Sequence, residues 1–273
     1  MLTLLDEPTN RMKNFEILRT PGGIRFGLLG NKGPTPGPTV FAFAGSVEDA
    51  LTLPQFNRCG LLLHEQGCLC VSVDLPCYAE DVRPGDSGDA SGTLVTGDWR
   101  RRLEKGEDLM QGFVTRASSV LSHLIAEEFT DPAKVAAYGI SRGAFAALHL
   151  AARDPRVRSI AGIAPLVDFL ALREFAGLEN HAGARAQALV HHASRLAGRS
   201  IWLSIGNNDD RVDTDRVVAF ARAVTKTSFA ANEDHSAGRT PVDVELHVCP
   251  SIGHSAPAHS DEMAAAWILK KLK

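Results

Sequence analysis

A serine between two glycines stands where a buried strand is expected to end and a helix to begin. Ser141 lies in the pentapeptide Gly-Ile-Ser-Arg-Gly at residues 139–143, between an apolar run at 135–138 and an Ala/Leu-rich helical pattern at 144–152. So tight a turn leaves no room for side chains at the two glycine positions, and it lifts the serine hydroxyl clear of the sheet at a helix N-terminus. This context predicts a nucleophilic serine; the alternative is an ordinary helix N-cap.

A serine hydroxyl is a poor nucleophile without a base, and the base needs an acid to orient it. Asp209 follows the apolar run at 201–205, and His254 follows the alternating run at 242–248. Because ligands of open α/β sheets bind at the rim formed by the strands' carboxyl ends, we expect all three side chains to meet there. The alternatives for the acid are Asp210 and Asp168.

Other residues that could bind a metal or a cofactor lack the spacing that such sites need. The five cysteines are an odd, sparse set without paired spacing, which favours reduced thiols in a cytoplasmic protein. The histidines at 181, 191 and 192 have no carboxylate or cysteine at ligand spacing, so no metal is expected. Neither a G-x-G-x-x-G nor a Walker sequence occurs, so no cofactor is expected.

The elements that must position the serine, aspartate and histidine follow from alternating strand-like and helix-like patterns, which predict an α/β fold with a mostly parallel sheet and helices on both faces. The first two strands are expected to form an antiparallel hairpin, and the period-two alternation of the last strand favours a sheet edge. Strands are expected at residues 15–19, 24–29, 39–44, 69–73, 135–138, 157–164, 201–205 and 242–248. Helices are expected at residues 109–125, 144–152, 213–225 and 259–272.

Two stretches interrupt this alternation. Residues 78–106 are rich in Gly, Asp and Arg and are expected to form a long loop, whereas residues 169–198 have helical composition and are expected to form a small cap insertion. Neither stretch is long enough to bury a core of its own. We therefore expect a single domain over residues 1–273.

Composition excludes several classes of function. The 29 Lys and Arg residues against 32 Asp and Glu residues give a net charge of −3, which offers no general electrostatic attraction to nucleic acid or to an anionic membrane. No apolar run approaches the roughly 20 residues of a membrane-spanning helix. The first 14 residues lack the basic start and apolar block of a signal peptide. A cytoplasmic location is expected, and the oligomeric state is left open.

The chain resembles the α/β-hydrolase superfamily over roughly residues 24–272, and within it the branch of prolyl-oligopeptidase-type and dienelactone-hydrolase-like domains. The resemblance rests on the pentapeptide at 139–143, on Gly-x-x-Asp-Asp-x-Val at 206–212 and on Gly-His at 253–254. It implies the α/β-hydrolase fold, with Ser141 as nucleophile and His254 as base and then acid. In that branch the acid commonly stands three residues after the glycine, which selects Asp209.

The resemblance also implies an oxyanion hole, made by the backbone N–H of Arg142 and one from the loop after the third strand. That loop reads Phe-Ala-Gly-Ser at 43–46, where relatives often carry His-Gly. We expect the N–H of Ser46 as the second donor, followed by that of Gly45. Because the two long stretches begin at the same rim as the serine, Trp99 and Phe169 are the candidate substrate-binding residues.

The expected function is therefore that of a serine hydrolase cleaving a small-molecule carboxylic ester through an acyl-enzyme. The first alternative is a serine peptidase of the prolyl-oligopeptidase type. Such enzymes carry a large propeller ahead of the catalytic domain, whereas 38 residues precede the third strand here, which favours small esters. The second alternative is a non-catalytic binding protein on the same fold, against which the presence of all three triad residue types argues.

Overall fold

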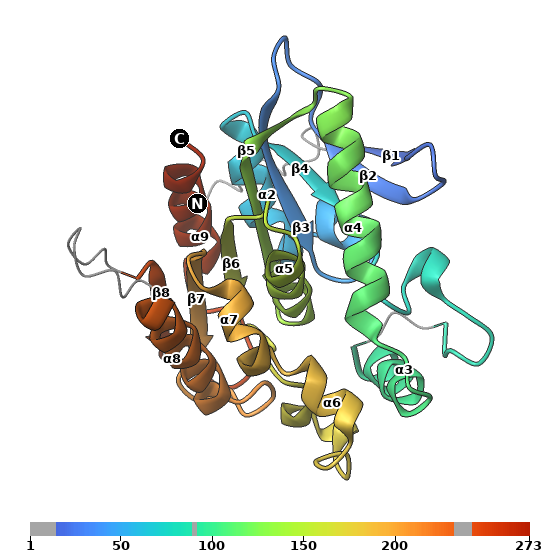
Figure 1. Ribbon diagram of the computed structural model, residues 1–273, viewed down its shortest axis with the longest axis vertical. Coiled ribbons are helices and arrows are strands. Elements are labelled where there is room, and N and C mark those ends of the chain that lie inside the picture. The colour runs from blue at the N-terminus through green and yellow to red at the C-terminus, as the bar shows by residue number, and fades with distance from the viewer. Residues whose placement is uncertain (1–14, 89–91, 232–241) are drawn as a thin grey trace, which may run out of the picture.

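The computed structural model describes residues 15–88, 92–231 and 242–273 and contains one eight-stranded sheet in the order β1-β2-β4-β3-β5-β6-β7-β8 (Figure 1). All eight expected strands are present, with ends that differ by a few residues. They are β1 (Phe15–Arg19), β2 (Arg25–Leu29), β3 (Gly37–Phe43), β4 (Leu69–Ser72), β5 (Thr130–Ile140), β6 (Ser159–Ile163), β7 (Ser200–Gly206) and β8 (Val244–Cys249).

The strand directions agree with the expected mostly parallel sheet. β1 and β2 form the antiparallel hairpin, and β2 joins β4 in antiparallel pairing. The pairs from β4 through β3, β5, β6 and β7 to β8 are all parallel. β8 lies at the edge, as its alternating sequence predicts. The carboxyl ends of β5, β7 and β8 therefore meet at one rim.

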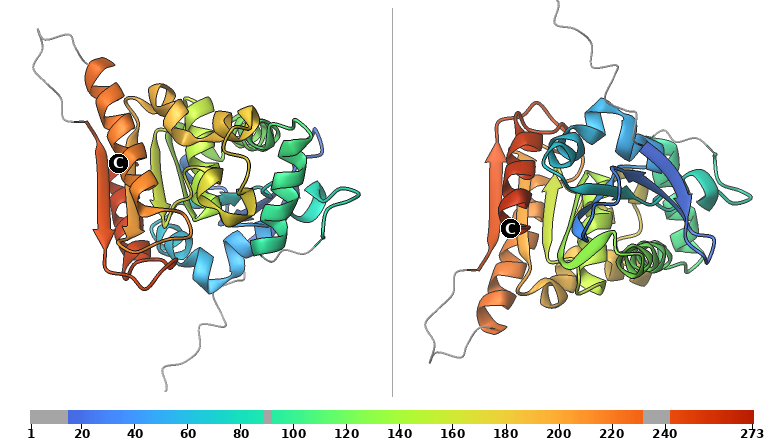
Figure 2. Two further views of the ribbon diagram at one scale, coloured as in Figure 1. Left: turned by 90° about the horizontal axis from the view of Figure 1, so that it is seen from below. Right: turned by 90° about the horizontal axis from the view of Figure 1, so that it is seen from above.

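Helices cover both faces of the sheet (Figure 2). One apolar cluster joins the sheet to α4, α5 and α8, and a second joins the opposite face to α1, α2 and α9. The long helices on the first face are α4 (Leu109–Ala126), α5 (Arg142–Arg153) and α8 (Thr214–Ala231). The helices on the second face are the short α1 (Val47–Thr52), α2 (Pro54–Glu65) and α9 (Ser260–Lys271).

The helix α4 shows how the pattern specifies the packing. Asp108 caps its first turn by accepting a hydrogen bond from the N–H of Gln111 at 2.9 Å. Its apolar residues recur every three or four positions, so they form one stripe that is buried against α5 and the sheet. This stripe and the helices α5, α8 and α9 are confirmed, whereas α1 and α2 are elements that the sequence patterns did not predict.

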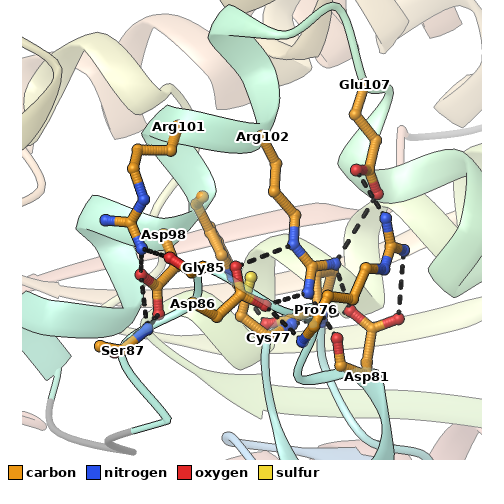
Figure 3. Close-up of polar contacts among 12 residues, drawn as sticks. Pro76, Cys77, Asp81, Gly85, Asp86, Ser87, Asp98, Arg101, Arg102 and Glu107 are labelled. Carbon is orange, nitrogen blue, oxygen red and sulfur yellow. Dashed lines mark hydrogen bonds and ion pairs between the residues drawn. The ribbon is translucent and has the colours of Figure 1, made fainter.

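The expectation of a long loop at 78–106 is wrong, because much of that stretch is the helix α3 (Gly92–Glu104). Arg102 near its end exposes only 6% of its side chain and forms ion pairs with Asp81 and Asp86 (Figure 3). Burial would lower the pKa of Arg102, but its hydrogen bonds to Asp86 and Asp81 raise it above the ordinary value. The same close-up shows Asp98 bonded to Ser87 and Arg101. These pairs fasten α3 to the segment that follows β4.

The cap expected at 169–198 consists of short helical turns. They are η2 (Phe169–Ala171), η3 (Arg173–Phe175), α6 (Ala182–Gln187), η4 (Leu189–His192) and α7 (Ala193–Leu196). Stacked rings of Phe169 and Phe175, with centroids 4.8 Å apart, anchor the cap in the main core.

No helix in the described ranges is both long enough and apolar enough to cross a bilayer. The expectation about a signal peptide concerns the first 14 residues, which lie outside the described residues.

Candidate active site

Ser141 occupies a strained turn between β5 and α5. Its φ of 54° and ψ of −113° lie in a region that residues with side chains rarely adopt. A Cβ at Gly139 would stand 2.2 Å from the carbonyl carbon of Gly143, and one at Gly143 would stand 1.8 Å from the carbonyl oxygen of Phe43. Only glycine fits at either position. The turn therefore holds the serine hydroxyl at the N-terminus of α5, at the carboxyl end of the sheet.

The side chains of Ser141, His254 and Asp209 form a hydrogen-bonded chain. His254 Nε2 lies 3.0 Å from Ser141 Oγ, and His254 Nδ1 lies 2.8 Å from Asp209 Oδ2. The aspartate follows β7 and the histidine follows β8, so residues far apart in sequence meet at the rim where β5, β7 and β8 end. The structure thus brings together the three residues that the sequence selects.

The aspartate sets the hydrogen-bonding state of the imidazole. Asp209 is buried, and its Oδ1 accepts the backbone N–H groups of Arg211 at 3.1 Å and Val212 at 3.2 Å. Burial would raise the pKa of Asp209, but the hydrogen bond from His254 and these two N–H groups lower it below its ordinary value. An ionised carboxylate only accepts hydrogen bonds, so Nδ1 must carry the imidazole proton and Nε2 faces Ser141 with its lone pair.

Neither alternative acid occupies this position. Asp210 is exposed beside the buried Asp209. Asp168 caps η2 through the N–H of Leu170 at 2.9 Å and forms an ion pair with Arg216. The carboxylate that bonds to His254 is that of Asp209.

The two expected oxyanion donors have different surroundings. Arg142 is the first residue of α5, so its backbone N–H belongs to the N-terminal turn next to Ser141. Ser46, in contrast, is the N-cap of α1, and its N–H donates to Asp49 Oδ2 at 3.1 Å while its Oγ accepts the N–H of Asp49. This capping box uses the amide that was expected in the oxyanion hole. Ser46 therefore does not offer it in this conformation.

A cavity of about 200 Å³ adjoins the serine and the histidine. Most of its lining residues are polar, and Leu172 of the cap is the apolar one. The residues that line it are Thr93, Thr96, Ser141, Arg142, Leu172, Arg211 and His254.

Trp99 and Phe169, the expected substrate-binding residues, do not line this cavity. Both side chains are fully buried, and their rings meet edge to face at a centroid distance of 5.7 Å. Trp99 also donates its indole N–H to the carbonyl of Pro76 at 2.7 Å. Trp99 and Phe169 pack α3 and the cap onto the core, whereas Thr93, Thr96 and Leu172 of the same segments line the cavity. The prediction is therefore right about the two segments that border the site, but the two residues that it selects belong to the core.

Glu174 in the cap ties three walls of the cavity together. Its carboxylate accepts two hydrogen bonds from Arg211, at 2.6 Å and 3.0 Å, and Arg211 belongs to the loop that carries Asp209. Its backbone carbonyl accepts a hydrogen bond from Arg100 of α3 at 2.8 Å. The arginines at 100–102 lie near the end of α3, where ion pairs and carbonyl oxygens hold them.

Four cysteines in the described part of the chain, Cys59, Cys68, Cys70 and Cys77, are poorly placed to compete as nucleophiles. Four of the five are buried, and all five are free thiols. Burial raises the pKa of Cys68 to about 11 and raises that of Cys59, Cys70 and Cys77 as well. A thiol with a raised pKa is a poor source of thiolate at neutral pH.

Solved structures with the same fold include small esterases and larger peptidases. TT1662 from Thermus thermophilus is similar over 95% of this chain and 98% of its own, with a TM-score of 0.64 and 19% identity. A cold-adapted esterase from an Arctic intertidal metagenomic library gives a TM-score of 0.62 and 17% identity over 95% of this chain and 93% of its own. A puromycin-hydrolyzing peptidase of Mycobacterium tuberculosis gives 0.66 and 16% identity over 98% of this chain, which spans 41% of that peptidase.

At these identities the similarities show a shared fold, that of the α/β-hydrolases, as the sequence resemblance implies. A search of curated proteins gives no match. The family model described as "Putative esterase" matches residues 82–248, a segment that contains Ser141 and Asp209 and ends just before His254. Since this match covers more than half of the sequence, the chain belongs to the esterase family of α/β-hydrolases.

Proposed function

We propose that the protein is a serine hydrolase that cleaves a small-molecule carboxylic ester through an acyl-enzyme, with Ser141, His254 and Asp209 as its triad. The observation that carries this proposal is the pair of hydrogen bonds, 3.0 Å from Ser141 Oγ to His254 Nε2 and 2.8 Å from His254 Nδ1 to Asp209 Oδ2. Both lie within the reach that proton transfer requires. Membership of the esterase family supports the same activity.

In the first half of the reaction, Ser141 Oγ attacks the ester carbonyl carbon while His254 Nε2 takes the hydroxyl proton. The resulting tetrahedral oxyanion collapses, and the alcohol leaves with the proton that His254 returns. A water molecule then repeats both steps on the acyl-enzyme and releases the acid. Asp209 stays ionised throughout and stabilises the imidazolium that forms twice per cycle.

We assign the oxyanion hole to the backbone N–H groups of Arg142 and Gly45. Gly45 replaces Ser46 because the amide of Ser46 is held by Asp49. The loop after β3 touches the serine turn, since the carbonyl of Phe43 fills the space that a side chain at Gly143 would need. Each donor in such a hole typically contributes about 2.7–4 kcal/mol to the barrier reduction.

A panel of p-nitrophenyl esters, run beside aminoacyl anilides with the wild type and Ser141→Ala, tests this function. We expect measurable kcat/KM on esters, little on anilides, and a loss of about 10⁶ in kcat for Ser141→Ala. A folded Ser141→Ala variant that keeps ester hydrolysis within tenfold of the wild type would remove Ser141 from the nucleophile role. Faster cleavage of anilides than of esters would replace the esterase assignment by a peptidase.

A further inference from the structure

A groove of about 620 Å³ lies at the amino-terminal ends of the strands, opposite to the rim of carboxyl ends that carries Ser141. It opens where β5, β6 and β7 begin, beside the C-terminal end of α9, which lies at the upper end of Figure 1, away from α3 and α6. β7 alone spans about 20 Å at roughly 3.3 Å per residue, so this groove is separate from the catalytic cavity.

The charged side chains that line the groove are basic, and the carboxylate of Asp243 stands beside two other lining residues, Ser200 and Lys271. Arg158, Arg199 and Lys271 line it, and none of the described residues that line it is acidic. Lys271 is already paired with Asp243. The two arginines therefore determine what the groove can bind.

Arg158 and Arg199 start side by side. Each directly precedes a strand, and the first residues of these strands, Ser159 and Ser200, are partners in the parallel register of β6 and β7. The N–H of Ser200 donates to the carbonyl of Arg158 at 3.0 Å, which locks the two segments together. Neighbouring strands lie about 4.8 Å apart, so the two arginines that line the groove start from adjacent backbone positions.

Neither guanidinium is neutralised within the described ranges of the chain, where no hydrogen bond or ion pair joins Arg158 or Arg199 to a carboxylate. The Nε of Arg199 is buried without a partner. Burial lowers the pKa of Arg199, the positive charge of Arg158 lowers it further, and Asp154 opposes this only in part. Asp154 itself is held by Arg156, at 2.6 Å from Nη2 to Oδ2.

We propose that this groove binds a phosphate group. Two adjacent guanidinium forks offer several parallel N–H donors, which match the oxygens and the nearly double charge of phosphate better than those of a single carboxylate. A bound phosphate relieves the repulsion between the two arginines. The groove is large enough to hold the organic part of a phosphate ester as well.

Calorimetric titration of the full chain with inorganic phosphate, at constant ionic strength set by NaCl, tests the proposal. We expect one saturable site in the wild type and a Kd that rises about tenfold or more in Arg158→Gln, because one of the two charged forks is lost. Arg173→Gln is the matched control: it removes an arginine whose side chain is 79% exposed in the cap, and its Kd should equal that of the wild type.

Ser141→Ala should bind phosphate as the wild type does, so this result stands whether or not the proposed ester hydrolysis is found. Arg199→Gln should also lose binding, and if this half-buried position does not tolerate the change, Arg158→Gln alone decides. A parallel titration with glycerol 3-phosphate distinguishes the two sources of the ligand: tighter binding than inorganic phosphate indicates a phosphate ester, and weaker binding indicates the free ion. The absence of binding at millimolar phosphate, or equal Kd values in the wild type and Arg158→Gln, would overturn the proposal.

Discussion

Replacing Asp209 by Asn changes the triad in a way that the structure defines in detail. Oδ1 of Asp209 accepts two backbone N–H groups, from Arg211 and Val212, and Oδ2 faces His254 Nδ1 at 2.8 Å. In Asp209→Asn the amide oxygen must take the Oδ1 place, because an NH₂ group there would face two donors. The NH₂ group then points at Nδ1 and donates to it.

The imidazole of His254 must consequently carry its proton on Nε2, the nitrogen that faces Ser141. In this tautomer it cannot accept the serine proton, so the loss resembles the roughly 10⁴-fold fall in kcat known for this substitution in serine proteases. At 1.36 kcal/mol per factor of ten, this corresponds to about 5.4 kcal/mol of transition-state stabilisation.

The assay is kcat/KM on a short-chain p-nitrophenyl ester, with Asp210→Asn as the matched control. Asp210 is the exposed neighbour, and the carboxylate bonded to His254 is that of Asp209, so this control should retain wild-type activity. Circular dichroism checks that both variants are folded. If Asp209→Asn kept activity within tenfold of the wild type, or if both variants lost activity equally, the assignment of Asp209 as the triad acid would be refuted.

The size of the cavity, the packing of α3 and the charge of Asp154 at the far end of α5 lead to three further predictions. The cavity of about 200 Å³ is smaller than the roughly 300–1,000 Å³ of typical ligand pockets. The kcat/KM on p-nitrophenyl esters should therefore fall from acetate or butyrate to octanoate. A rise along this series would contradict the assignment of the cavity as the acyl site. Trp99→Ala should lower the free energy of unfolding by about 3–5 kcal/mol and leave the ratio of short-chain to long-chain activity unchanged. Leu94→Ala, at an exposed position of the same helix, should have little effect on stability. A changed ratio in Trp99→Ala would show that Trp99 contacts the acyl chain. Burial would raise the pKa of Asp154, but hydrogen bonds from Arg156 and Ser118 lower it below its ordinary value. The Asp154 carboxylate therefore stabilises the fold above the unfolded-state pKa of about 3.9, and this stabilisation is lost as the pH falls through the folded-state pKa. The difference in melting temperature between the wild type and Asp154→Asn should therefore be largest near pH 7 and shrink towards pH 3, and a constant difference would refute this origin.

The meeting of Ser141, His254 and Asp209 could be predicted from the sequence because the sheet sets their positions. Once Ser141, Asp209 and His254 are assigned to the carboxyl ends of three parallel strands, the fold leaves them one place to meet. The glycines around the serine are equally local, since their neighbours at 2.2 Å and 1.8 Å come from the turn itself and from the adjacent strand.

The walls of the cavity could not be predicted in the same way, because they depend on contacts between distant segments. The helix α3 is rich in polar residues, and the ion pairs of the buried Arg102 with Asp81 and Asp86 help to hold it. Nothing in the arginine run itself indicates these partners. For the same reason Trp99, a large aromatic residue at the right rim, was a reasonable candidate for the pocket and is instead buried.

The outcome at Ser46 has a signal that the sequence did contain. The pattern Ser-x-x-Asp at 46–49 is that of a capping box, and it indicates that the backbone N–H of the serine is used by the aspartate. Because α1 begins at Val47, the loop after β3 is only three residues long, from 44 to 46. Gly45 is the residue of that loop left for the oxyanion assignment.

Labelling of the folded protein by a fluorophosphonate probe tests most directly whether Ser141 is an activated nucleophile. Intact-mass and peptide analysis should find one adduct per chain on Ser141, because His254 lies 3.0 Å from its hydroxyl and can take the proton as the phosphonyl bond forms. Ser141→Ala should show no adduct, and His254→Ala should react far more slowly. A folded protein without an adduct, or with its adduct on another residue, would contradict the account and favour a binding protein that keeps the fold without the chemistry.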